Sequence, residues 1–133
     1  MPLHWLIGSR DRLVTVTGDG RVGRDDIEHW LDIVDGAGLL PYRKLVDLGG
    51  AALDLRAEDI MTLGIRFRAH HTTRMGPLAL VLPPEVPEAV ERGLGILAAG
   101  ERPMRLFRTL SRARRWLATA AVTSPVATPS SGA

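Results

Sequence analysis

Short apolar segments alternate with longer amphipathic segments along most of the chain. Residues 3–7 and 13–17 are apolar or β-branched and flank a turn-forming stretch at 8–11, which predicts an antiparallel hairpin. Further strands are predicted at 44–48, 78–82 and 104–107. The run at 78–82 is apolar on both faces, as is typical of a central parallel strand.

Between these strands, apolar positions recur every three or four residues and predict amphipathic helices. The first carries Ile27, Trp30, Leu31 and Val34 on one face, after an acidic start at Asp25. Three more helices are predicted, one after residue 57, one from about 87 to 99, and one after the strand at 104–107. The order β-β-α-β-α-β-α-β-α predicts an α/β fold with a mixed, mainly parallel sheet of about five strands packed by about four helices.

The length of 133 residues is that of one domain, which we place at residues 1–120. Residues 121–133 are Pro, Ser, Thr, Ala, Val and Gly, and they predict a flexible tail because they have little apolar surface to bury. No apolar run reaches the length of a membrane span, and the N-terminal residues lack the pattern of a signal peptide. We therefore expect a cytoplasmic location.

Three motifs bear on cofactors and metals. The chain has no cysteine, which excludes disulfides, thiolate metal sites and cysteine nucleophiles. The segment Gly18–Gly23 reads GxGxxG, but the acidic helix start that follows it would repel a dinucleotide pyrophosphate. A glycine-rich turn is the alternative reading, and we favour it. His70 and His71 are adjacent on a predicted helix and point in different directions, so we expect no metal and no cofactor.

The charges are unevenly distributed, although the net charge is only +2. Residues 1–60 hold 7 basic and 11 acidic groups, whereas residues 61–133 hold 10 basic and 4 acidic groups. A basic face is predicted near the C-terminus at Arg105, Arg108, Arg112 and Arg115. Few aromatic residues accompany it, so nucleic-acid binding is not expected. A solvated helix face is one reading, and homodimerisation against the acidic first helix of a second copy is another.

The arrangement resembles the SpoIIAA-like, STAS-type proteins, in particular a small stand-alone bacterial branch, over residues 3–118. The resemblance rests on the hairpin ending at Gly18, the strand Leu45-Val46-Asp47-Leu48 followed by Ala57-Glu58-Asp59-Ile60, the strand at 78–82, and the closing segment at 107–117. It implies a mixed sheet with helices mainly on one side. It also implies a regulatory or protein-interaction module without enzymatic activity.

The resemblance implies an interaction loop after the Asp-containing strand, formed by Asp47, Gly49, Gly50, Asp54, Leu55 and Arg56. Regulatory members of the family are phosphorylated on a Ser or Thr here, where a helix N-terminus suits the added charge. This chain has Leu55 at that position and no Ser or Thr between Thr17 and Thr62. The alternative reading of Asp47 and Asp54 is that they cap a helix or stabilise the loop.

A second hypothesis is an apolar pocket between helices and sheet that binds a small molecule or a lipid, lined by Trp30, Phe67 and Trp116. The same three residues are also what plain core packing would bury. Sequence-local catalytic motifs, such as a nucleophile elbow or a Walker A loop, are missing from the chain, so an enzyme is not expected.

Overall fold

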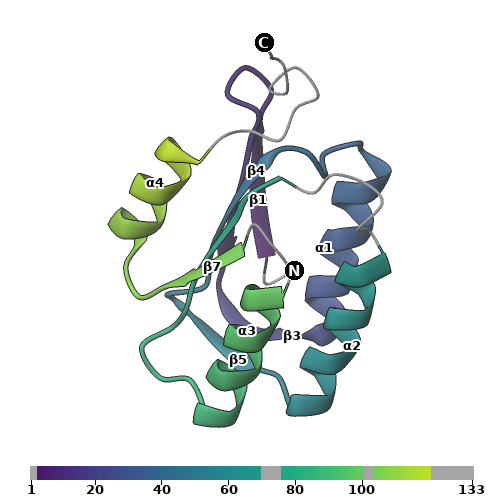
Figure 1. Cartoon of the computed structure of the whole chain (residues 1–133), viewed down its shortest axis with the longest axis vertical. Helices are drawn as coiled ribbons and strands as arrows, with labels where there is room; N and C mark the ends of the chain where they lie inside the picture. Colours follow the sequence, from purple (N-terminus) through teal and green to yellow (C-terminus); the bar gives the residue numbers. More distant parts are fainter. Residues whose placement is uncertain (1–2, 70–75, 101–103, 121–133) are drawn as a thin grey trace.

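The computed structural model describes residues 3–69, 76–100 and 104–120. In chain order its elements are β1 (Leu3–Gly8), β2 (Leu13–Gly18), β3 (Gly20–Gly23), α1 (Arg24–Gly36), β4 (Arg43–Asp47), β5 (Ala51–Asp54), α2 (Ala57–Ala69), β6 (Leu78–Val81), α3 (Glu88–Gly100), β7 (Met104–Phe107) and α4 (Leu110–Thr119) (Figure 1). Every element predicted from the sequence is present. The predicted tail at 121–133 and the pair His70 and His71 lie outside the described residues.

The main sheet has five strands in the order β1-β2-β4-β6-β7. β1 and β2 form the predicted antiparallel hairpin, and the other neighbours are parallel. The helices α1, α2 and α3 connect successive parallel strands. This confirms the predicted mixed, mainly parallel α/β fold.

The two faces of the sheet carry separate apolar clusters, because successive side chains of a strand point to opposite faces. Val46 and Leu80 belong to the larger cluster with the buried residues of α1, α2 and α3. The smaller cluster, with α4, contains Leu45, which precedes Val46 in sequence, and Ala79, which precedes Leu80. Figure 1 shows α4 on one side of the sheet and the other three helices on the opposite side. Within the described ranges, no helix is long and apolar enough to cross a bilayer.

A second sheet, not predicted from the sequence, lies at one end of the molecule. It is a two-stranded parallel ribbon in which β3 pairs with β5, with Val22 opposite Leu53. The predicted interaction loop therefore contains a strand, Ala51–Asp54, that the sequence did not predict. Each strand has only four residues, so neither shows enough alternation of apolar and polar positions to be recognised.

Packing and backbone geometry account for the glycines of the GxGxxG segment. A Cβ on Gly18 would lie 2.6 Å from Cδ2 of Leu48, so a larger residue here would displace that side chain. Gly20 has φ of 75°, in the left-handed region that favours glycine. Gly23 is the N-cap of α1. The three glycines therefore allow the chain to leave β2, form β3 and enter α1 within a few residues.

Candidate functional site

The predicted interaction loop begins with a tight turn after β4. The Oδ1 atom of Asp47 accepts a hydrogen bond from the backbone N–H of Gly49 at 3.0 Å. The backbone N–H of Ala51 donates to the carbonyl oxygen of Leu48 at 3.0 Å, which closes the turn across Gly50. Asp47 thus stabilises the turn that leads into β5, as the loop-stabilising reading of this residue requires.

The last three residues of the predicted loop have different surroundings. Asp54 ends β5 with an exposed side chain, 3.9 Å from the guanidinium of Arg21 on β3. Leu55 is buried in the core, so its side chain is not on the surface of the predicted interaction loop. The backbone N–H of Arg56 donates to Oδ2 of Asp59 at 2.8 Å, which caps the first turn of α2.

Charged side chains from the ribbon and from both helix starts meet in one open cleft of about 430 Å³. We call it the charged cleft, and it is lined by Arg21, Gly23, Arg24, Asp25, Asp26, Asp54 and Asp59. Of these residues, the sequence analysis assigned only Asp54 to a site. The others were missed because β3 was not predicted, and because residues at the starts of two separate helices gave no sign of being neighbours.

Arg24 and Asp26 fix the geometry of this cleft. The guanidinium of Arg24 lies 3.6 Å from the carboxylate of Asp59 on α2 and 3.8 Å from that of Asp25. Asp26 accepts a hydrogen bond from the backbone N–H of Gly23 at 2.9 Å, which caps α1. The cleft therefore combines cations and anions on a backbone held by strand pairing and helix caps, an arrangement suited to polar recognition.

The predicted aromatic pocket is not formed by its three residues together. Trp30 is buried in the cluster beneath α1, α2 and α3, whereas Trp116 packs on the other face of the sheet. There its ring lies 5.8 Å from the ring of Phe107. The side chain of Phe67 lies outside the described residues. The error arises because a sequence pattern identifies an apolar face without indicating which side of the sheet that face covers.

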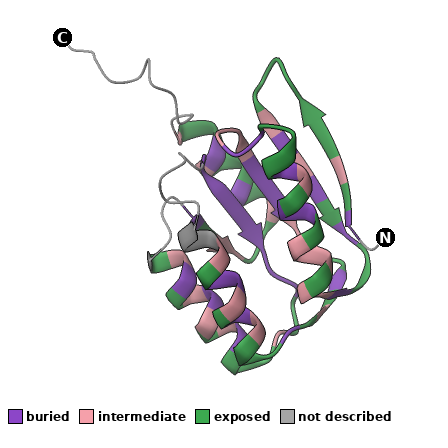
Figure 2. Cartoon of the chain, turned by 90° about the vertical axis from the view of Figure 1, so that its right-hand side faces the viewer, coloured by how far each residue is buried: buried purple, intermediate pink, exposed green. Residues whose placement is uncertain are grey.

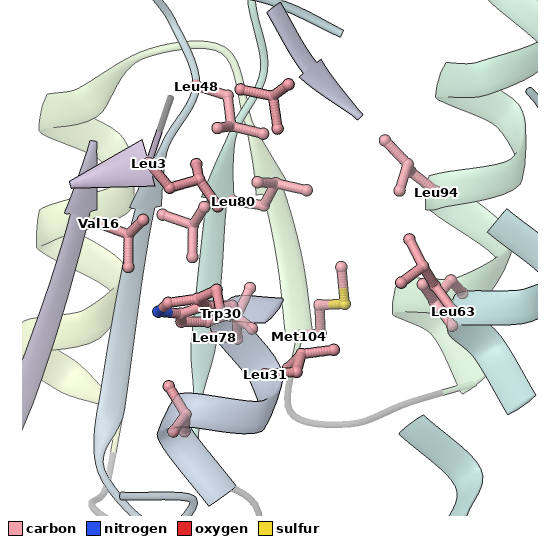
Figure 3. Close-up of a cluster of buried hydrophobic side chains, with 14 of the residues drawn as sticks. Leu3, Val16, Trp30, Leu31, Leu48, Leu63, Leu78, Leu80, Leu94 and Met104 are labelled. Carbon is pink, nitrogen blue, oxygen red and sulfur yellow. The ribbon is translucent and has the colours of Figure 1, made fainter. Parts of the chain in front are cut away.

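An apolar cavity of about 50 Å³ does lie next to Trp30, between the sheet and the three helices. It is lined by Leu3, Val16, Ile27, Trp30, Val46, Leu48, Leu53, Leu55, Leu63, Leu78, Leu80, Leu94, Leu97 and Met104. Figure 3 shows some of these side chains, among them Trp30, Leu63 and Met104, within the larger apolar cluster. The indole Nε1 of Trp30 is buried and has no hydrogen-bond acceptor in the described part of the chain. The surface of the cavity itself is entirely apolar, so this N–H is not part of its wall.

The predicted basic face is exposed to solvent at all four positions, Arg105, Arg108, Arg112 and Arg115. The guanidinium of Arg108 pairs with the carboxylate of Glu91 on α3, within the same chain. Asp32 of the acidic first helix likewise pairs with Arg66 on α2. Part of the charge that was expected to join two copies is therefore neutralised within one copy.

Lys44 is a buried charged residue that the sequence analysis did not single out. It is fully enclosed on β4, and its Nζ donates to the carbonyl oxygens of Leu40 and Tyr42. Burial lowers its pKa from 10.5 to about 7, because a low-dielectric interior disfavours the ammonium form. It is the only lysine of the chain, a signal that could have drawn attention to it.

Comparison with known proteins supports the fold. The chain matches no protein-family model, and no curated protein matches it. Among solved structures, it is similar to an uncharacterised protein of the DUF3478 family from Shewanella loihica PV-4, which has a SpoIIAA-like fold. The two share 18% sequence identity with a TM-score of 0.52, over 86% of this chain and 91% of the other. The predicted SpoIIAA-like fold is thereby confirmed.

Proposed function

We propose that the protein is a non-enzymatic SpoIIAA-like module that binds a protein partner through the charged cleft. The observation that carries this proposal is the mixed set of charges on the β3–β5 ribbon, beside the first turns of α1 and α2. Arg21 and Asp54 have side chains that are 80% and 61% exposed, so a partner can reach them.

The strength of the ion pairs supports recognition rather than stabilisation. An exposed pair such as Arg21–Asp54, 3.9 Å apart, contributes only about 0–1 kcal/mol to folding. These side chains can therefore exchange their weak intramolecular contacts for a partner's charges at little cost. The backbone beneath them is fixed by strand pairing and by the caps of two helices, which limits the entropy lost on binding.

The proposal is tested by affinity purification of the tagged protein from its native cells, with quantitative mass spectrometry. We expect the partner recovered with wild type to fall by about tenfold with Asp54→Ala and with Arg21→Glu, since charge pairs fix register and orientation. Asp35→Ala is the matched control, because Asp35 is exposed near the other end of α1. Equal recovery with all variants would remove the charged cleft from consideration.

A second candidate function is the binding of a small apolar molecule in the apolar cavity. The entirely apolar lining favours it, because burial of a ligand's apolar surface in such a cavity removes that surface from water. The volume of about 50 Å³ holds only a few heavy atoms, so a larger ligand requires α2 or α3 to move outward.

Native mass spectrometry of the purified protein tests this second candidate. We expect an adduct with wild type that weakens in Leu94→Phe, because the larger side chain fills part of the cavity. Trp116→Phe is the control, because that ring packs on the opposite face of the sheet. No adduct in any of the three proteins, including after incubation with short-chain fatty acids, would exclude the cavity as a binding site.

A further inference from the structure

One face of the main sheet is only partly covered. On one side, α1, α2 and α3 lie over the sheet, whereas on the other side α4 is the helix present in the described part of the chain (Figure 1). α4 packs on β4, β6 and β7. The strands β1 and β2, at the other edge of the sheet, extend beyond it.

The side chains of β1 and β2 show that this half of the face is open. On β2, Val14 and Val16 point to the three-helix side and are buried, whereas Thr15 and Thr17 on the α4 side are not. Leu6, which is opposite Thr15 in the register, also points to the α4 side and is 77% exposed. Figure 2 shows the exposed colouring that extends along β1. We call the part of the sheet formed by His4, Leu6, Leu13, Thr15 and Thr17 the open sheet face.

The open sheet face combines apolar side chains with polar side chains other than Asp, Glu, Lys and Arg. A sheet face that meets water normally carries polar side chains that alternate with the buried ones. Here the members are two leucines, two threonines and one histidine, without any Asp, Glu, Lys or Arg. Among them, the exposed Leu6 is the large apolar side chain that a packing partner would cover.

The width of the open sheet face matches one helix. Two strands spaced about 4.8 Å apart present a surface of about 10 Å, and a helix with its side chains is about 10–12 Å in diameter. A groove of about 300 Å³ already runs between α4 and the sheet at this place. It is lined by Leu13, Thr15, Arg43, Leu45, Arg114, Leu117 and Ala118.

The charges of the groove identify the chemistry of its occupant. Both charged residues that line it, Arg43 and Arg114, are cations, and neither forms an ion pair with a carboxylate of the described residues. The guanidinium of Arg43 is held by hydrogen bonds to the carbonyl oxygens of Leu117 and Asp11, each at 3.0 Å. Its Nε is buried without an acceptor among the described residues and is not accessible to a partner, so Arg43 acts on an occupant of the groove through its charge.

We propose that the open sheet face and the adjacent groove bind an acidic, amphipathic helix of a partner protein. The helix lies beside α4, places its apolar side on Leu6 and Thr15, and directs carboxylates to Arg43 and Arg114. It completes the second helical layer of the sheet in the same way as α4 does over β4, β6 and β7. Residues 121–133 do not fit this role, since they contain two prolines and no acidic residue. The surface is separate from the charged cleft, so the two proposals stand or fall independently.

The test begins with selection of a random 16-residue peptide library on the full chain, followed by affinity measurements on synthetic peptides by fluorescence anisotropy. We expect the selected peptides to carry Asp or Glu together with apolar residues at i, i+3, i+4 and i+7. Arg114→Glu and Leu6→Glu should each weaken binding by about tenfold or more, because each places a negative charge against the acidic peptide.

Two matched control variants show whether the loss of peptide affinity arises at the groove and the open sheet face. Arg115→Glu makes the same charge change one position along α4, outside the groove, and Ile7→Glu makes the same change on the opposite face of β1. Both should change the affinity by less than about twofold, because neither side chain lines the groove, and Asp54→Ala should leave it unchanged. Failure to select any peptide, selection of peptides without this pattern, or equal loss in control and test variants would overturn the proposal. Dimerisation of the free protein that Leu6→Glu abolishes would also overturn it, since a second copy would then be the occupant.

Discussion

The Nζ atom of Lys44 lies 2.7 Å from the carbonyl oxygen of Tyr42, in a part of the core from which solvent is excluded. The same ammonium donates to the carbonyl oxygen of Leu40, which also accepts the backbone N–H of Gly76. Lys44 therefore joins β4 to the connection that follows α1, at a place where that connection meets the start of β6. Its burial makes the stability of the fold depend on pH.

The first prediction concerns this pH dependence. The pKa of Lys44 is about 7 in the folded protein and 10.5 in the unfolded chain, so the unfolded chain binds more protons between these values. The free energy of unfolding should rise as the pH increases from 7 toward 10, by about 1 kcal/mol per pH unit, and the contribution of Lys44 should be constant below pH 7. Urea denaturation at a series of pH values measures the slope.

Lys44→Met is the control for that experiment, because it keeps a long unbranched side chain without a titratable group. The slope between pH 7 and 10 should largely disappear in the variant, while contributions from other groups remain the same in both proteins. A wild type and a variant with parallel pH profiles would show that Lys44 does not titrate in this range.

The second prediction concerns Gly76, which lies against the backbone of the loop before β4. A Cβ at this position would be 2.3 Å from the carbonyl oxygen of Pro41 and 2.4 Å from that of Tyr42. Because these are backbone atoms of a packed segment, Gly76→Ala must displace the loop. We expect a loss of about 3 kcal/mol or more in the free energy of unfolding, measured by urea denaturation. A loss below about 1 kcal/mol would show that the loop moves freely.

The third prediction compares two glycines of α3. A Cβ on Gly95 would point into open space, with no contact within 4 Å beyond its own helix, so Gly95→Ala should stabilise the protein by about 0.5–1 kcal/mol through helix propensity. A Cβ on Gly93 would lie 3.1 Å from Cδ1 of Ile60 on α2. Gly93→Ala should therefore stabilise the protein less than Gly95→Ala does, or destabilise it. Thermal denaturation of both variants measures the change in melting temperature. An equal increase in both would contradict the close packing of α2 on α3.

The spacing of apolar residues predicts the longer helices and strands of this fold and their buried faces, but not its shortest strands. The apolar spacing in α1 and the alternation in β2 are long enough to define their buried faces, and Trp30, Leu31, Val14 and Val16 are buried as expected. The strands β3 and β5 are too short to show a period, and their pairing joins residues about thirty positions apart. The charged cleft depends on that pairing, so its composition could not be predicted from the sequence.

The sequence also does not predict which of two neighbouring loop residues is buried and which is exposed. Leu55 stands next to the exposed Asp54, and both were assigned to one interaction loop. In the structure, the chain leaves β5 at this point, and Leu55 turns into the apolar cavity while Asp54 faces solvent. A short segment without regular periodicity gives no basis for distinguishing the two orientations.

The last prediction tests the different roles of these two neighbours. Leu55→Ala removes buried methyl groups next to an existing cavity, so we expect a loss of about 2–4 kcal/mol in the free energy of unfolding. Asp54→Ala should change that free energy by less than about 1 kcal/mol, because an exposed ion pair at 3.9 Å contributes little. Urea denaturation of both variants, together with the partner recovery described for Asp54→Ala, separates stability from recognition. If Leu55→Ala left stability unchanged but abolished partner recovery, Leu55 would be a contact residue, and its assignment to the core would be wrong.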